Sequence, residues 1–289
     1  MLSPRERAHF ETFGFIVLRS ALTAAEVRRV DEECLRRLEA AYPHAPFDGT
    51  ARHWTGMNGP ATPFVASLME DPRFWGIAQQ LFGEHAVGAH CDGSRCTKDT
   101  TWHPDTVSAR LGGVKFALYL QPLGADSGAL RVIPGSHREP LHEQIARYLG
   151  AERPAIAEVP GVALVSSPGD VLCYDIRLWH AVVGGFPDRR FCTLTYYHFP
   201  PVPEVESAAR AQDLINRRFV REMARPELEA AARAAVARPF HPHEALYDPH
   251  WVENTAGSAL RTRWLGRLRA LGFLDEMALP EQPIELPHA

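Results

Sequence analysis

The sequence predicts a mainly β fold with helical flanks, in which a barrel or sandwich of short strands lies between N-terminal and C-terminal helices. Between about residues 86 and 200, short β-rich runs alternate with turns that contain Gly, Pro and Asp, a pattern typical of all-β sandwiches and barrels. No glycine-rich phosphate loop follows any of these runs, so a nucleotide-binding Rossmann sheet is not expected.

The N-terminal part reads as a helix, a strand and a second helix. Residues 13–18 form an apolar, partly β-branched run that suits a buried strand. Thr23 begins the next helix, because Glu26 follows three residues later and completes a capping box. The apolar stripe of this helix comprises Val27, Val30, Leu35 and Leu38, and Pro43 ends it.

Five strands and a helix are expected in the middle of the chain, and helices return after it. The strands are residues 114–120, 129–133, 162–165, 170–174 and 191–197, with a helix at 140–149 between them. The later helices are residues 204–223, 227–236 and 259–271, with a loop at 240–251. Because no repeat or linker interrupts this order, we expect one domain over 1–289, with the β core at about 86–200 and a helical extension at about 201–289.

Composition excludes several classes of protein. A net charge of -4 and a pI near 6.4 argue against a nucleic-acid or anionic-membrane partner. No run approaches the roughly 20 apolar residues of a membrane helix, and the first nine residues lack the apolar core of a signal peptide. We therefore expect a cytoplasmic monomer or homodimer that acts on a small molecule. The cysteines are odd in number and scattered along the chain, which is not the pattern of a disulfide scaffold. We expect all five to be reduced, packed thiols: Cys34, Cys91, Cys96, Cys173 and Cys192.

The pair His103 and Asp105 is the sharpest chemical feature. In an extended segment, residues two apart project from the same face, so both side chains can reach one ion. A second imidazole would complete a two-histidine, one-carboxylate triad, which leaves room for a bidentate 2-oxoacid and dioxygen on a divalent metal. His180 is the candidate, because it follows a turn and strand at 167–174; the alternative is an ordinary buried histidine.

Arg189 and Arg190 stand at the start of the strand at 191–197. Either guanidinium can bind the distal carboxylate of 2-oxoglutarate through a bidentate, charge-assisted contact. The alternative is a pair of exposed hairpin arginines, which are common in an arginine-rich chain.

Three blocks resemble the phytanoyl-CoA dioxygenase family of 2-oxoglutarate oxygenases. They are Trp-His-Pro-Asp at 102–105, Ser-Gly-Ala-Leu-Arg-Val-Ile-Pro-Gly-Ser-His at 127–137, and the segment 168–180, from Pro-Gly-Asp to Arg-Leu-Trp-His. The likeness spans roughly residues 10–199, and the middle block is the most specific. It implies a double-stranded β-helix (a cupin-like jelly roll), Fe(II) as the metal, and 2-oxoglutarate and O2 as co-substrates.

Carried over residue by residue, the resemblance makes His103, Asp105 and His180 the iron ligands. It places the 2-oxoglutarate arginine about ten residues past His180, with Arg190 as first choice and Arg189 as second. Asp105 favours oxygenation, because the related halogenases have a small residue at that position. The Gly-Ser that often follows the distal histidine is replaced by Ala181 and Val182, so another side chain must assist 2-oxoglutarate; the candidates are Thr193, Thr195, Tyr119 and Lys115.

The substrate is the least determined feature. Trp54, Trp102, Arg52, Arg177 and the loop at 241–247 are candidates to line its pocket, whereas His137 is interpreted as a structural turn residue. The expected reaction is hydroxylation of an unactivated C–H bond with release of succinate and CO2. The same cofactor chemistry can instead give desaturation, cyclisation or epimerisation. A cupin-like metal isomerase or hydrolase would use no 2-oxoglutarate, and a non-catalytic binding protein is disfavoured because all three ligand positions are filled.

Overall fold

Two antiparallel β-sheets form the core of the protein, as expected for a double-stranded β-helix. The computed structural model describes residues 1–43, 45–96, 98–223 and 258–273. The larger sheet has the order β1-β8-β5-β10-β3-β2 and the smaller sheet β4-β9-β6-β7. The strands are β1 Phe15–Leu18, β2 His53–Gly56, β3 Ala86–Cys96, β4 Thr100–His103, β5 Gly112–Tyr119, β6 Leu130–Val132, β7 Val162–Leu164, β8 Val171–Asp175, β9 His180–Val182 and β10 Arg189–His198.

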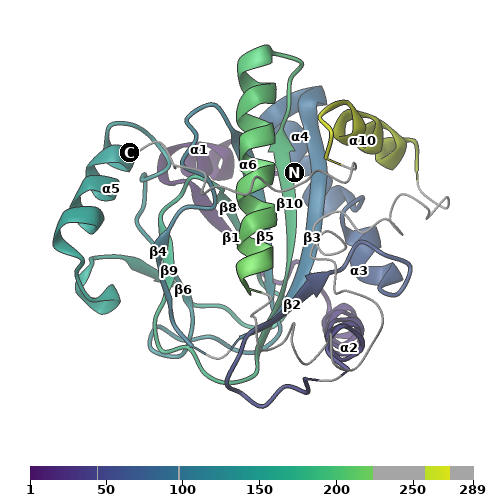
Figure 1. The fold of residues 1–289 in the computed structure, drawn as a ribbon, viewed down its shortest axis with the longest axis vertical. Coiled ribbons are helices and arrows are strands. Elements are labelled where there is room, and N and C mark those ends of the chain that lie inside the picture. Colours follow the sequence, from purple (N-terminus) through teal and green to yellow (C-terminus); the bar gives the residue numbers. More distant parts are fainter. Residues whose placement is uncertain (44, 97, 224–257, 274–289) are drawn as a thin grey trace.

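Helices flank both sheets (Figure 1), and α5 lies at the end of the molecule that holds the small sheet, whereas α2, α3, α4 and α10 lie at the opposite end. The helices are α1 Pro4–Phe13, α2 Ala24–Ala41, α3 Pro63–Leu68, α4 Pro72–Phe82, α5 Leu141–Glu152, α6 Pro203–Met223 and α10 Ala259–Ala270, with short 3₁₀ helices η1 Gly83–His85 and η2 Ile156–Glu158. The capping box predicted for α2 is present, since Glu26 N–H donates to the Thr23 hydroxyl and the Thr23 N–H donates to Glu26.

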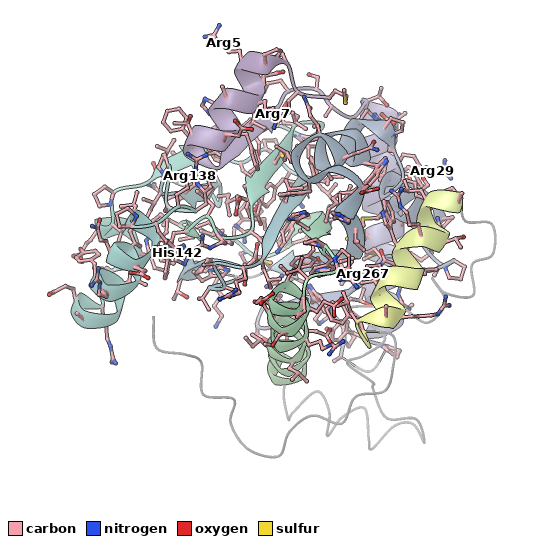
Figure 2. All side chains as sticks on the ribbon, turned by 90° about the horizontal axis from the view of Figure 1, so that it is seen from above. Arg5, Arg7, Arg29, Arg138, His142 and Arg267 are labelled. Atoms are coloured by element: carbon pink, nitrogen blue, oxygen red, sulfur yellow. The ribbon has the colours of Figure 1, made fainter. Side chains whose placement is uncertain are left out.

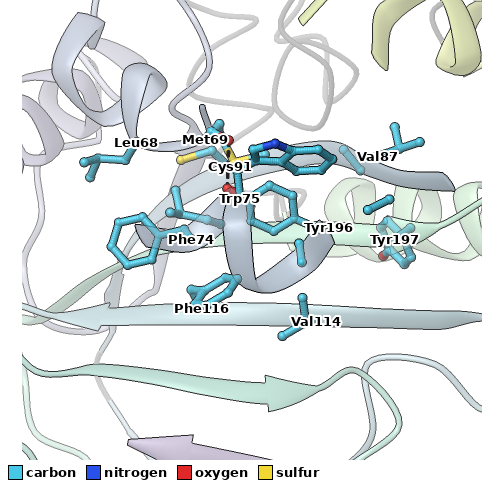
Figure 3. Close-up of a cluster of buried hydrophobic side chains, with 14 of the residues drawn as sticks. Leu68, Met69, Phe74, Trp75, Val87, Cys91, Val114, Phe116, Tyr196 and Tyr197 are labelled. Carbon is cyan, nitrogen blue, oxygen red and sulfur yellow. Dashed lines mark hydrogen bonds between the residues drawn. The ribbon is translucent and has the colours of Figure 1, made fainter. Parts of the chain in front are cut away.

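One face of the large sheet, called the outer face here, packs against α2, α3, α4 and α10. The contact is made by a large cluster of buried apolar side chains, called the outer cluster. Figure 3 shows Phe116 and Tyr196 from the sheet meeting Phe74 and Trp75 from α4. Trp264 of α10 closes this cluster over β3, where a Cβ on Gly88 would lie 2.7 Å from the indole ring. The glycine therefore lets an aromatic ring approach the strand closely.

The C-terminal helix is part of the same core. Trp264, Leu265, Leu268 and Leu271 are buried in the outer cluster, so the apolar stripe predicted at 259–271 packs inside the protein. Arg267, labelled in Figure 2, joins α10 to α6 by donating to Glu206 Oε1 at 2.8 Å.

The mainly β class and the five strands predicted from the sequence are confirmed, with bounds that shift by a few residues. The strand β3 was not predicted, because Ala-Val-Gly-Ala-His-Cys-Asp-Gly-Ser-Arg-Cys contains one β-branched residue and two glycines. All five cysteines are buried free thiols, as expected. Within the described residues, no helix is long and apolar enough to cross a membrane. The helix predicted at 227–236 and the loop at 240–251 lie outside those residues.

Candidate metal centre

Two histidines and one aspartate converge where β4 meets β9. His103, the last residue of β4, lies directly opposite His180, the first residue of β9, and their ring centroids are 4.3 Å apart. Asp105 follows two residues later and is anchored by its N–H, which donates to Ile176 O at 2.8 Å. One potential ligand atom from each of the three side chains lies within 4.8 Å of the others. The structure therefore brings together all three predicted metal ligands.

Hydrogen bonds to the backbone orient both imidazoles. His103 Nδ1 lies 2.7 Å from Thr101 O, and His180 Nδ1 lies 2.8 Å from Leu178 O. A carbonyl oxygen only accepts, so each Nδ1 carries the proton and each Nε2 keeps its lone pair for a metal.

The protonation states suit metal binding. Burial lowers the pKa of His180 to about 3, with a further contribution from neighbouring His103, and burial also lowers the pKa of His103. For Asp105, burial alone would raise the pKa, but the Lys115 ammonium and the two imidazoles outweigh it and hold the pKa at about 2. At neutral pH the site therefore offers two neutral imidazoles and one carboxylate.

A divalent cation fits this arrangement. Lys115 Nζ lies 2.7 Å from Asp105 Oδ1, so the Asp105 carboxylate is negatively charged and already pairs with a cation through one of its oxygens. The second oxygen, Asp105 Oδ2, is buried without a hydrogen-bond partner among the described residues. Two nitrogens and a hard carboxylate oxygen on one side of an ion match the donor set preferred by non-haem iron.

Adjacent arginines on β10 point to opposite faces of the large sheet. Arg189 is 2% exposed; its Nη1 donates to Gly128 O at 2.7 Å, and its Nε has no partner in the described part of the chain. Arg190 lies on the outer face, where its Nε donates to Asp31 of α2 at 2.7 Å and its Nη1 to Asp188 at 2.7 Å. The preference for Arg190 as the 2-oxoglutarate arginine conflicts with these contacts, because two carboxylates already occupy its guanidinium.

The middle block of the resemblance has a structural explanation. Gly128 has a φ of +80°, and a Cβ there would lie 3.0 Å from Arg189 Cδ, so the glycine makes room for the arginine. Ser136 Oγ accepts the N–H of Trp179, the residue before His180. His137 packs on Gly14 and lies outside the metal cluster, in agreement with its interpretation as a structural residue.

The other predicted site residues divide into two groups. Tyr119, Thr193 and Trp54 lie on the inner face of the large sheet, defined here as the face that carries Lys115. The Tyr119 ring centroid is 5.9 Å from the Arg189 guanidinium carbon. Thr193 donates its hydroxyl to Asp92 Oδ1, and Trp54 Nε1 donates to Asp92 Oδ2 at 2.9 Å.

Trp102 and Arg177 make their contacts outside the metal cluster, and their assignment to the substrate pocket stays a prediction. Since side chains alternate along β4, Trp102 points away from His103; it packs beside Trp179 and Ile145, and its Nε1 donates to Ile156 O at 3.0 Å. Arg177 donates to His137 O and to Glu139 Oε1. The loop at 241–247 lies outside the described residues.

Three further residues on the inner face of the large sheet were not singled out from the sequence. The Tyr174 ring centroid lies 5.2 Å from that of His180, and His90 and Asp92 of β3 belong to the inner face. Tyr174 could have been found, because side chains alternate between the two faces of β8 and Tyr174 is a polar residue in that predicted strand. His90 and Asp92 could not, because β3 itself was not predicted.

The sequence profile of the phytanoyl-CoA dioxygenase family matches residues 10–182. No curated protein matches the chain. Among solved structures, HygX from Streptomyces hygroscopicus with nickel and 2-oxoglutarate bound is 21% identical, covers 69% of this chain and 88% of its own, and has a TM-score of 0.57.

Two further structures have the same fold. EctD from S. alaskensis with bound Fe is 23% identical and covers 68% of this chain and 76% of its own, with a TM-score of 0.53. SnoN, a non-haem α-ketoglutarate-dependent epimerase from nogalamycin biosynthesis, is 18% identical and covers 71% of this chain and 88% of its own, with a TM-score of 0.52.

Proposed function

The chain belongs to the phytanoyl-CoA dioxygenase family, a family of iron- and 2-oxoglutarate-dependent oxygenases, and from this premise we propose that it hydroxylates an unactivated C–H bond of a small-molecule metabolite. In this proposal His103, Asp105 and His180 hold Fe(II). When bound, the iron supplies the activation of dioxygen, which is coupled to conversion of 2-oxoglutarate to succinate and CO2. HygX with nickel and 2-oxoglutarate, and EctD with iron, support the same cofactors for this chain.

The observation that carries the proposal is the convergence of the triad. One donor atom from each of the three side chains lies within 4.8 Å of the others, close enough for all three to reach one ion. A facial set of this kind leaves about three adjacent metal positions open, enough for a bidentate 2-oxoacid and dioxygen. Both imidazoles are held by backbone carbonyls, so the donors are oriented before a metal arrives.

Arg189 is proposed to bind the distal carboxylate of 2-oxoglutarate. It is the buried member of the arginine pair, and its unpartnered Nε needs an acceptor, since a buried charged donor is costly when unsatisfied. Tyr119 lies beside it and can add a hydroxyl contact. Lys115, on the same face of the sheet, pairs with Asp105 in this structure and is a candidate second contact for the dianion.

The whole chain is proposed to form one oxygenase domain. Residues of α6 and α10 are buried in the same cluster as the large sheet, including Ala209, Trp264 and Leu268. The C-terminal helices then belong to the catalytic unit.

Release of succinate from 2-oxoglutarate, measured with added Fe(II) and candidate metabolites, tests the proposal. Wild-type protein should require both Fe(II) and 2-oxoglutarate, and the product of a hydroxylation should contain one added oxygen atom. His103→Ala and Asp105→Ala should reduce succinate release to background, because each removes a ligand. The matched controls are His85→Ala and Asp126→Ala, which alter half-exposed and exposed side chains away from the cluster. Normal turnover in Asp105→Ala would contradict the assignment.

A further inference from the structure

The inner face of the large sheet carries a row of polar side chains that begins at the metal centre. By strand register, Tyr174 lies opposite Lys115, Lys115 opposite Thr195, and Thr195 opposite His90. Residues directly opposite each other on paired strands share a face. Since Lys115 contacts Asp105, the row runs from the metal cluster across β10 to β3, and His90 lies two strand spacings, about 10 Å, from Lys115.

Two members of this row lack hydrogen-bond partners. His90 is 7% exposed and neither ring nitrogen has a partner among the described residues. Thr195 is fully buried, and its hydroxyl is unpartnered as well. Buried polar groups are nearly always satisfied in native proteins, by the protein or by a bound molecule, so three unpartnered polar atoms on one patch of the inner face make it a place for a bound polar molecule.

His90 serves as a neutral hydrogen-bonding group. Burial lowers its pKa to about 4, so at neutral pH one ring nitrogen donates and the other accepts. The neighbouring Thr195 hydroxyl can do both. A ligand with several polar groups therefore suits this patch better than a hydrocarbon chain, which would bury these atoms without compensation.

The next row contains a carboxylate that forms no ion pair with any residue that the structure describes. Asp92, two residues from His90 on the same face, is 6% exposed and accepts from the Trp54 indole and the Thr193 hydroxyl. Lys115, the lysine of this face, is paired with Asp105, and Arg52 donates to Ser94 Oγ at 2.7 Å. Among the described residues, no cationic nitrogen forms an ion pair with Asp92.

Resting on the proposed function, we infer that His90, Asp92 and Thr195 form the substrate-recognition face of the site, and that the substrate is a small polar molecule with an ammonium group. The ammonium ion-pairs with Asp92, whose carboxylate retains lone pairs beyond those used by Trp54 and Thr193. His90 and Thr195 bind hydroxyl or carbonyl groups of the same molecule. An ammonium group on the substrate would neutralise the buried Asp92 carboxylate, which has no ion-pair partner among the described residues.

Binding to protein loaded with Ni(II) and 2-oxoglutarate, which does not turn over, tests this inference by ligand-observed NMR. The probes are three matched pairs, each an amine and its analogue without the ammonium group: glucosamine and glucose, 5-aminopentanoate and pentanoate, and tyramine and 4-ethylphenol. At least one amine should bind about tenfold or more tightly than its partner, as expected for a desolvated charged contact. Asp92→Asn, which keeps the shape and an acceptor oxygen, should abolish this preference. His90→Gln should weaken the same amine by about tenfold.

Binding of Ni(II) and 2-oxoglutarate, measured on the same samples by calorimetry, separates this inference from the proposed function. Asp92→Asn and His90→Gln should bind both as wild type does, and Asp126→Asn, an exposed carboxylate, should retain the amine preference. If the loaded wild type binds no amine, binds both members of every pair equally, or keeps its preference in Asp92→Asn, the inference is wrong while the oxygenase proposal stands. Failure to bind Ni(II) and 2-oxoglutarate would overturn both.

Discussion

Replacing Arg189 with leucine should weaken 2-oxoglutarate binding far more than it weakens the fold. Arg189 is 2% exposed; its Nη1 donates to Gly128 O, and its Nε has no acceptor among the residues that the structure describes. A two-point contact of this kind to a carboxylate contributes about 3 kcal/mol. At about 1.4 kcal/mol per factor of ten, the loss corresponds to roughly a 150-fold rise in the KM for 2-oxoglutarate. Arg189→Lys should recover only part of the affinity, because lysine keeps the positive charge but lacks the planar pair of N–H donors that binds a carboxylate at two points.

The neighbouring residue provides the control. Arg190→Leu removes ion pairs with Asp31 and Asp188 on the outer face, so its unfolding midpoint should fall modestly while the KM for 2-oxoglutarate stays near the wild-type value. Succinate release measured against 2-oxoglutarate concentration, together with urea unfolding, distinguishes the two variants. A large rise in KM for Arg190→Leu with an unchanged KM for Arg189→Leu would refute the assignment.

Three further predictions concern stability and the glycine beside the arginine. The pKa of His90 is lowered from 6.5 to about 4, so as pH falls through this range the unfolded chain binds a proton at this residue that the folded protein does not. At about 1.36 kcal/mol per pH unit, His90 alone should cost the fold about 2 kcal/mol between pH 7 and pH 5. Urea unfolding at the two pH values should therefore show a loss of stability that is smaller by about this amount in His90→Gln than in the wild type. Glu33 is buried and accepts the N–H groups of Phe64 and Val65, so Glu33→Ala should destabilise the protein by about 2 kcal/mol, whereas the same change at exposed Glu32 should leave the unfolding midpoint within error. Gly128→Ala should raise the KM for 2-oxoglutarate, since the new Cβ would meet the Arg189 side chain at 3.0 Å; an unchanged KM would show that the glycine does not position the arginine.

Two of the three proposed metal ligands could be predicted from local sequence, and the third could not. His103 and Asp105 are two residues apart, a spacing that places both on one side of an extended segment. His180 is remote in sequence, and its position opposite His103 depends on the pairing of β4 with β9. The resemblance of the flanking blocks supplied that long-range information, which spacing alone does not contain.

The choice between the two arginines illustrates what local patterns leave open. Most of β10 is buried on both faces, so its sequence shows no single apolar face that would tell Arg189 from Arg190. The alternation does carry a signal, since Arg189 shares its side of the strand with Thr193 and Thr195, whereas Arg190 shares its side with apolar Cys192 and Leu194.

The polar patch on β3 was beyond prediction for a different reason. His90 and Asp92 lie in a strand whose glycines and small residues give it low β propensity. The strand is held instead by its neighbours β10 and β2 and by packing of its outer face. Tertiary contacts decide the structure at this position.

Anaerobic titration of the protein with Fe(II) and 2-oxoglutarate, followed by the visible charge-transfer absorption of the iron–2-oxoacid chelate, tests the central claim most directly. Wild-type protein and His85→Ala should develop the absorption in stoichiometric proportion, whereas His180→Ala and Asp105→Ala should not, because each lacks one of the three donors that hold the metal. The same absorption at the same affinity in His180→Ala, or none in the wild type, would contradict the metal centre formed by His103, Asp105 and His180.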